Sequence, residues 1–269
     1  MHKIVEKKQL ADTITLMKVE APMVVRESKP GQFVVVRLDE FAERIPLTIC
    51  DADKARGTVT LIIQQLGRST KDLCALKAGD QIRDILGPLG NPTEIEKFGT
   101  VVIIGGGVGA AELYTAAKAL KEKGNKVITI IGARNKSLII LEDEFKPIAD
   151  EVLITTDDGS YGIKGFVTDA LKKVISEQKV DRVICCGPIP MMKAVTMTAK
   201  PHNIPAIVSL NAILLDATGM CGSCRCTIEG KTKFSCVDGP EFDGYKVDFD
   251  ELMARNKRFL DEERRALEV

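Results

Sequence analysis

The sequence has no surplus of charge of either sign. Lysine and arginine together number 38, aspartate and glutamate together also number 38, and the formal net charge at pH 7 is zero. A protein that binds nucleic acid or an anionic membrane through its overall electric field carries a clear excess of positive charge. The composition therefore predicts neither nucleic acid nor a membrane as a partner.

Long apolar segments are missing as well. No apolar run approaches the ~20 residues that cross a bilayer. The N-terminal MHKIVEKKQLADTITL lacks the apolar stretch of a secretory signal. We therefore expect a cytoplasmic protein, in which a local group of cysteines indicates metal binding or catalysis rather than disulfides.

The eight cysteines fall into two groups. Four lie close together in DATGMCGSCRCTIEGKTKFSC, residues 216–236. The other four are scattered among apolar residues, as is typical of small buried side chains: Cys50, Cys74, Cys185 and Cys186.

Four regions follow one another along the 269 residues. Residues 1–97 contain short β-branched runs separated by turn residues, which predicts a small antiparallel barrel or sandwich, of which we choose the barrel. Residues 98–206 alternate apolar strands with helices, as in a doubly wound parallel sheet. Residues 207–245 hold the cysteine group, and residues 246–269 form a charged, helical tail. The predicted fold class is therefore α/β plus β-barrel, with a small C-terminal lobe.

A glycine-rich turn in the second region indicates a nucleotide site. In TVVIIGGGVGAAE, small residues separate an apolar strand from a helix, namely Gly105, Gly107, Gly109 and Ala110. Such a turn lets the backbone approach a pyrophosphate at the start of the helix. A tight turn without a ligand is the alternative.

Other strand ends in this region are predicted to line the same crevice. The second strand ends at Arg134, where an acidic residue would bind an NAD ribose, and this alone favours NADP. Asp157 ends the third strand and Cys186 the fourth, beside the predicted nicotinamide position. A turn aspartate and a core cysteine are equally good interpretations. Gly187 and Pro188 follow at the start of the next helix.

Several motifs together resemble a known superfamily. ERIPLTICD, LGRSTKDL and GPLGNP in the first region precede GGGVGAAE, CGPIPMM and the late cysteines. This order resembles the ferredoxin–NADP reductase superfamily, whose flavin lies on a six-stranded barrel. The resemblance covers nearly the whole chain. It is greatest to the small (alpha) subunits of electron-bifurcating NADH-dependent reduced ferredoxin:NADP oxidoreductases, which are related to the electron-transfer subunits of dihydroorotate dehydrogenase.

The resemblance implies three cofactors: FAD, a 2Fe-2S cluster and NAD(H), the last against the indication from Arg134. It implies that Arg44 meets the flavin pyrophosphate and that Thr48 lies near the reactive N5 of the flavin. The implied catalytic residues are Thr48 and Cys186. The implied flavin-binding residues are Arg44, Pro46, Leu47, Thr48, Gly67, Ser69, Thr70 and Gly87.

The late cysteines have the spacing of a plant-type two-iron site, except at its first position. That site opens with cysteine, and Asp216 stands there, followed by Cys221, Cys224 and Cys236. A carboxylate is a hard, anionic iron ligand, so we predict Asp216 as the fourth ligand. Two alternatives remain: Cys226 in place of Asp216, or zinc bound by Cys226 and the three other cysteines. By resemblance, aspartate is typical of the bifurcating subunits and cysteine of the dihydroorotate type.

These parts together predict electron transfer. A pyridine nucleotide gives up a hydride, a cluster accepts one electron, and a flavin converts between the two. This chemistry needs no acid–base dyad or nucleophilic triad, and the sequence shows neither. The alternatives are an electron-transfer subunit of an NAD-dependent dihydroorotate dehydrogenase and a non-catalytic zinc or redox sensor.

The chain has no second redox domain to receive the electrons. We therefore predict a heterodimer with a larger flavo-iron–sulfur subunit, through which the resemblance implies coupling to ferredoxin and NADP. The tail is either a docking element for that subunit or a helix packed on its own domain. Its apolar residues form a broken stripe: Val247, Phe249, Leu252, Met253, Phe259, Leu260 and Leu267.

Overall fold

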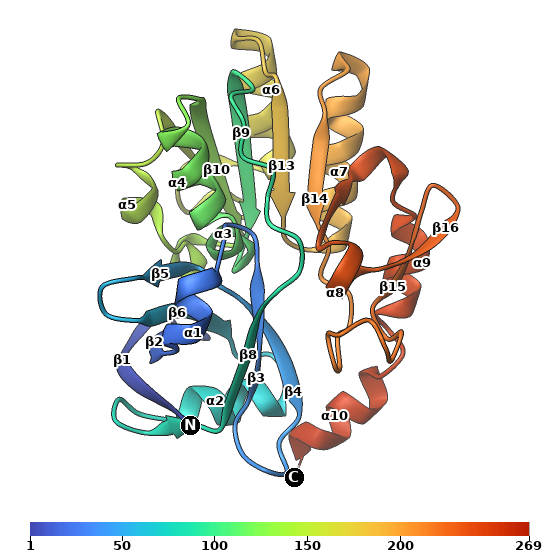
Figure 1. The fold of residues 1–269 in the computed structure, drawn as a ribbon. Coiled ribbons are helices and arrows are strands. Elements are labelled where there is room, and N and C mark those ends of the chain that lie inside the picture. The colour runs from blue at the N-terminus through green and yellow to red at the C-terminus, as the bar shows by residue number, and fades with distance from the viewer. Residues whose placement is uncertain (269) are drawn as a thin grey trace. The chain divides into compact units, whose positions relative to one another are not determined.

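The computed structural model describes residues 1–268, which pack into two units (Figure 1). Unit 1 comprises residues 1–92, 212–240 and those from 250 on. Unit 2 comprises residues 93–211 and 241–249. Within the described part of the chain, no helix has the length and apolarity needed to cross a membrane.

The N-terminal part of unit 1 consists of antiparallel strands in two sheets, one with strand order β5-β6-β2-β1-β7 and one with order β4-β3-β8. In β2, Met17 and Val19 are fully buried, whereas Lys18 between them forms an ion pair with Glu6 at 2.7 Å. This alternation is what a strand with one buried face requires. The strands are β1 (His2–Ala11), β2 (Ile14–Glu20), β3 (Phe33–Arg37), β4 (Arg44–Thr48), β5 (Asp51–Asp53), β6 (Thr58–Gln64), β7 (Gln81–Ile82) and β8 (Asp84–Leu89), with helices α1 (Pro22–Glu27) and α2 (Arg68–Ala75).

The cysteine segment and most of the tail also belong to unit 1. The segment forms an antiparallel hairpin of β15 (Arg225–Ile228) and β16 (Lys231–Phe234), followed by α8 (Ser235–Asp238). The tail forms α9 (Phe249–Arg255) and α10 (Leu260–Glu268). The predicted apolar stripe divides between them: Leu252 of α9 is fully buried, whereas Leu260 and Leu267 of α10 are each 40% exposed.

Unit 2 is built on a seven-stranded sheet with strand order β12-β11-β10-β9-β13-β14-β17. Residues 101–104 of β9 are buried throughout, because helices flank the sheet, with α6 and α7 in contact with each other (Figure 1). The strands are β9 (Thr100–Gly106), β10 (Lys126–Ala133), β11 (Glu151–Thr156), β12 (Ile163–Lys164), β13 (Arg182–Cys186), β14 (Ala206–Ser209) and β17 (Glu241–Asp243). The helices are α3 (Gly109–Glu112), α4 (Tyr114–Glu122), α5 (Glu142–Phe145), α6 (Val167–Glu177) and α7 (Ile189–Ala199), with short 3₁₀ turns at Lys136–Leu138, Lys200–His202 and Gly244–Lys246.

The strand pairings confirm the predicted fold class. All pairs from β12 to β14 are parallel, and β17 alone joins antiparallel. From β9 the chain adds β10, β11 and β12 on one side, and then it returns to add β13 and β14 on the other side of β9. The strand order therefore reverses between β9 and β13, which is where doubly wound sheets bind ligands. The strand β17 lies inside the range 207–245 predicted as the cysteine lobe, and the cofactor-domain boundaries themselves stay a prediction.

Candidate functional site

The first candidate site lies in unit 2, at the ends of β9 and β13. These strands are parallel neighbours, and Gly105 of β9 stands opposite Cys186 of β13. The glycine-rich turn and the Cys186-Gly187-Pro188 segment therefore leave the sheet side by side. The structure thus brings together two motifs that are about 80 residues apart in the sequence and that were both predicted to bind the dinucleotide.

Close approach explains two of the glycines. A Cβ at Gly105 would clash with the backbone of Ala110, and one at Gly109 would clash with the carbonyl of Cys186. Only glycine fits at these two positions, because Gly105 packs directly against Ala110 within the turn and Gly109 packs against the end of β13. The predicted role of Gly105, Gly107, Gly109 and Ala110 in binding pyrophosphate stays a prediction.

The helix after this turn is shorter than the sequence pattern suggests. Residues 109–112 form α3, and α4 begins after a break at Leu113. The amide of Gly107 donates to the carbonyl of Gly132 at 2.8 Å, so it ties the turn to β10. A ligand at the turn would therefore be met by the amides that follow Gly107 rather than by Gly107 itself.

A contact that the sequence did not reveal joins Cys186 to Glu112. The Cys186 thiol donates to the Glu112 carboxylate at 2.9 Å and also lies 3.7 Å from the carbonyl of Ser209. Burial and the neighbouring carboxylate raise the pKa of Cys186 well above its usual value, so it is a neutral thiol at pH 7. The signal that we did not use was the single acidic residue at the end of GGGVGAAE.

The remaining predicted nucleotide residues occupy the same edge of the sheet. Arg134 and Asp157 follow β10 and β11, whose last residues are in register, and both are exposed. Gly187 is buried, and the carbonyl of Pro188 accepts the first helical hydrogen bond of α7 from Met192 at 3.1 Å. No contact tests their predicted roles.

The predicted flavin-binding residues lie on β4, β8 and α2 of unit 1. Arg44 begins β4 and is exposed, and the strand continues through half-buried Pro46 and Leu47 to Thr48, which pairs with Phe33. Gly87 lies on β8, which flanks the other side of β3, and a Cβ there would contact Val34 at 2.8 Å. These residues thus fall on one three-stranded sheet.

The hydroxyl groups at the start of α2 already form hydrogen bonds within the protein. Thr70 accepts hydrogen bonds from the amides of Leu66 and Gly67, each at 3.0 Å, and so caps the helix. Ser69 donates to Glu43 at 2.7 Å. The predicted binding of phosphate by Gly67, Ser69 and Thr70 stays a prediction, and it requires these contacts to be exchanged.

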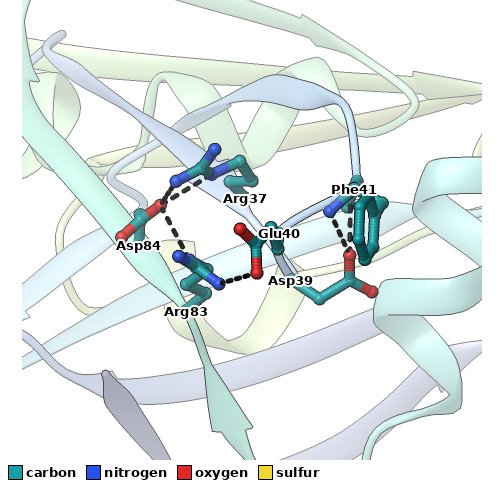
Figure 2. A network of polar contacts seen from close by, with 7 residues as sticks. Arg37, Asp39, Glu40, Phe41, Arg83 and Asp84 are labelled. Atoms are coloured by element: carbon teal, nitrogen blue, oxygen red, sulfur yellow. Dashed lines mark hydrogen bonds and ion pairs between the residues drawn. The ribbon is translucent and has the colours of Figure 1, made fainter.

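A cavity of about 320 Å³ adjoins these residues within unit 1. Its walls come from the β3–β4 connection, from α2 with Ser69 and Leu73, and from Ala266 of α10. An ion-pair network fixes the connection beside it (Figure 2). Arg37 binds Asp84 at 2.5 Å, and Arg83 meets Glu40 at 3.5 Å.

The second candidate site is the cysteine loop, also in unit 1. The sulfur atoms of Cys224 and Cys236 are 3.3 Å apart, although the two residues are 12 positions apart in the sequence. Asp216 accepts a hydrogen bond from the amide of Cys221 at 3.0 Å, and Cys221 itself is exposed. The predicted ligands are thus close in two pairs. Among residues 1–268, no group of three or more His, Cys, Asp or Glu side chains is placed to hold a metal ion.

The donor set of this loop nevertheless suits an iron–sulfur cluster. Three thiols and one carboxylate supply four anionic groups once the thiols lose their protons. Cys226, the alternative ligand, is buried on β15, with its sulfur 3.7 Å from the carbonyl of Lys233. Burial raises the pKa of Cys226 and of Cys236 to about 12, so cluster binding at either residue would release a proton.

Comparison with known proteins gives two family matches. Residues 211–248 match the iron-sulfur cluster binding domain of dihydroorotate dehydrogenase B. Residues 103–197 match the oxidoreductase NAD-binding domain. The two matches fall on the cysteine loop and on the glycine-rich turn with Cys186.

Relatives match along almost the whole chain. A Thermotoga maritima protein named dihydroorotate dehydrogenase B (NAD(+)), electron transfer subunit homolog, is 49% identical over 98% of this chain and 93% of its own. The subunit of that name from Shouchella clausii is 37% identical over 89% of this chain and 94% of its own. The solved structure of an NADH-dependent reduced ferredoxin-NADP oxidoreductase, described in terms of flavin-based electron bifurcation, contains a chain that is 48% identical. That match has a TM-score of 0.94 and covers 100% of this chain and 97% of that one.

These matches confirm the predicted oxidoreductase class and the predicted resemblance. They also support the predicted kinds of cofactor, namely a flavin, an iron–sulfur cluster and NAD(H).

Proposed function

The chain belongs to the family that comprises the electron-transfer subunits of dihydroorotate dehydrogenase B and the matching chain of NADH-dependent reduced ferredoxin-NADP oxidoreductase, and we propose that it is the electron-transfer subunit of an electron-bifurcating enzyme of the second type. When bound, FAD and a 2Fe-2S cluster supply the conversion of a hydride from NADH into single electrons. The recipient is a larger flavo-iron–sulfur subunit that couples NADPH and ferredoxin. A cytoplasmic location is part of this proposal.

Asp216 is the observation that favours the bifurcating type. By the resemblance described above, the dihydroorotate-type subunits have cysteine at this position. The two oxygens of Asp216 accept hydrogen bonds from the amides of Thr218 and Cys221, each at 3.0 Å. These bonds hold a carboxylate at the start of the loop that bears the first predicted cysteine ligand. Asp216, Cys221, Cys224 and Cys236 would hold the cluster.

The residues of unit 2 bind and orient the dinucleotide in this proposal. Gly105 packs closely on Ala110 and Gly109 on Cys186 of β13, and the absence of side chains at both positions gives a pyrophosphate direct access to the backbone. The neutral Cys186 thiol, which is hydrogen-bonded to Glu112, forms a buried, uncharged surface that excludes water beside the nicotinamide. Hydride transfer needs such positioning and exclusion of water, and it needs no nucleophile from the protein.

Anaerobic purification of the chain with its partner subunit tests the proposal. We expect extractable FAD, iron and acid-labile sulfide in equal amounts, and bleaching of the flavin absorbance by NADH. With electrons passing in the opposite direction, the complex should reduce ferredoxin and NAD⁺ together at the expense of NADPH. Material without flavin and acid-labile sulfide would overturn the proposal, and a colourless zinc protein would favour a sensor.

An electron-transfer subunit of dihydroorotate dehydrogenase is the second candidate. It is favoured by the Shouchella clausii relative, which bears that name and matches this chain over 94% of its own length. Dihydroorotate-dependent reduction of NAD⁺ by the native complex, without ferredoxin turnover, would establish this second function instead.

A further inference from the structure

The tail helix α9 holds the backbone of the cysteine loop through charged side chains. The carbonyl of Ser223 accepts hydrogen bonds from Arg255 at 3.4 Å and from Arg258 at 3.1 Å. Arg255 also donates to the carbonyl of Arg225 at 3.0 Å. The amide of Thr227 donates to Glu251 at 3.1 Å. Residues 223–227, which include Cys224, are therefore bound from one side by a single helix and the turn after it.

Burial and further contacts hold α9 and its arginines in place. Leu252 of α9 is fully buried, and the Arg255 side chain is only 17% exposed. Arg255 also lies 3.8 Å from Glu251, one helical turn earlier. The Arg258 guanidinium is held in turn by the carbonyl of Arg255 at 2.9 Å. Arg258 is exposed, and ordering its long side chain costs conformational entropy that its hydrogen bonds to two backbone carbonyls must offset.

We propose that Arg255 and Arg258 are positioning residues for the iron–sulfur cluster, which fix the peptide before Cys224 and raise the reduction potential of the cluster by their charge. The inference rests on the proposed function, because it requires a cluster at Cys221, Cys224 and Cys236. It assigns to the start of the tail a role other than the docking or simple packing expected from the sequence.

The geometric part of the proposal follows from the peptide unit. In a trans peptide, the carbonyl and the amide of the next residue point in opposite directions. Two guanidinium groups on the Ser223 carbonyl therefore turn the amide of Cys224 away from α9. Amides near cluster sulfur atoms tune the potential, and a fixed loop retains its metal longer.

The electrostatic part concerns the charge change on reduction. A cluster that gains an electron becomes more negative, so nearby positive charge stabilises the reduced state. Arg255 donates to the carbonyls of Ser223 and Arg225, the residues on either side of Cys224. Removal of this charge should therefore lower the reduction potential, and a lysine should restore it.

Substitutions that separate charge from hydrogen-bond geometry test the proposal on the complete chain. Arg255→Gln and Arg258→Gln remove the charge, and Arg255→Lys and Arg258→Lys keep it without the planar fork. Potentials are measured by anaerobic titration with electron paramagnetic resonance, and cluster loss by bleaching in a chelator. Arg264→Gln is the control, because Arg264 is 75% exposed on α10 and pairs with Asp261 at 3.4 Å.

We expect the glutamine variants to lower the potential and the lysine variants to keep it near the native value. All four should lose the cluster faster, by roughly tenfold or more, as removal of supporting contacts does in other metal sites. The control should match the native protein. If a glutamine variant does not fold, the lysine variant at the same position still decides the geometric part through its rate of cluster loss.

Three failures are distinguishable. Native potential and native rate of cluster loss in the variants, with the cluster present, would overturn the role of the arginines alone. A lysine variant that lowers the potential as much as glutamine would overturn the electrostatic part. Native protein without iron and sulfide would overturn the proposed function itself.

Discussion

The carboxylate of Asp216 forms two local hydrogen bonds without a bound metal. It caps the turn at Thr218 and holds the amide of Cys221, and these hydrogen bonds keep the pKa of Asp216 below its usual value. The side chain is therefore ionised at neutral pH, as a ligand must be. A serine or asparagine could cap this turn, but neither would supply a negative charge to iron.

We predict that Asp216→Ala destroys or destabilises the cluster and that Asp216→Cys keeps it with an altered spectrum. Thiolate donates more charge to iron than carboxylate does, so the cysteine variant should shift both the visible absorption and the reduction potential. Absorption and electron paramagnetic resonance spectra measure both. Asp143→Asn, at an exposed carboxylate, is the control. If both variants retain the native spectrum and potential, Asp216 is not a ligand.

Cys186 and Glu112 provide a second test at single residues. Cys186→Ala removes a hydrogen bond to a carboxylate, a contact worth about 1.5–3 kcal/mol, or roughly tenfold or more in an equilibrium. We expect weaker NADH binding and slower reduction of the flavin, followed by stopped-flow absorbance. Cys185→Ala is the matched control, since Cys185 is the adjacent residue and equally buried. Equal effects at both positions would show that only packing is involved.

At the scale of elements, one side chain joins the turn after α4 to the entry into β9. The buried Asn125 accepts from the amides of Phe98 and Gly99 at 2.8 and 3.1 Å. It donates to the carbonyls of Glu96 and Leu120 at 2.8 and 2.9 Å. All four hydrogen-bonding positions of the amide are therefore used, which makes this residue a sensitive point of unit 2.

Asn125→Ala should lower the free energy of unfolding by about 2–4 kcal/mol, because buried backbone groups lose their partners. Asn125→Asp keeps the acceptors and loses the donors, so its effect should be smaller at acidic pH than at neutral pH. Denaturant unfolding followed by circular dichroism gives both values. A change below about 1 kcal/mol for alanine would mean that water replaces the side chain.

The carboxylate of Asp150, directly before β11, makes the stability of unit 2 depend on pH. Asp150 binds Lys121 at 2.6 Å and the amide of Val127 at 2.8 Å, and the lysine hydrogen bond lowers its pKa. A lowered folded-state pKa gives stability that is present above pH 3.8 and is lost as pH falls through the folded value. Stability should therefore fall below about pH 4, and Asp150→Asn should flatten that fall. Identical pH profiles for the two proteins would contradict this.

At the scale of the whole molecule, the two helices of the tail differ in their contacts. α9 buries Leu252 and forms hydrogen bonds with the cysteine loop through Glu251 and Arg255, whereas α10 buries none of its residues. Its apolar side chains, such as Leu260 and Leu267, are available to a partner. The expected larger subunit would supply the missing cover, because apolar anchors dominate the energy of protein interfaces.

A chain that ends after Phe259 should keep its cofactors and its thermal stability. Its association with the larger subunit should weaken roughly tenfold or more, since it loses two apolar anchors. Analytical ultracentrifugation of the mixed subunits measures this, with Met23→Ala as a control at an exposed apolar side chain of α1. Unchanged association would place the interface elsewhere on the chain.

The sequence by itself determined which chemistry is possible, because cofactor ligands are specific residue types at short spacings. The glycine turn and the cysteine loop are each local, and runs of buried residues such as 101–104 can only be strands of a covered sheet. Family comparison confirmed the class that these motifs predicted.

Only the tertiary structure decided which distant residues share a contact. Three such contacts join residues about 30 or more positions apart: the hydrogen bond between Cys186 and Glu112, the pairing of β17 with β14, and the hydrogen bond from Arg255 to the carbonyl of Ser223. Hydrophobic periodicity gives the direction in which a side chain points but not the partner that it meets. Long-range pairing follows from packing of the whole chain, and for this reason the contacts of the tail with the cysteine loop became visible only in three dimensions.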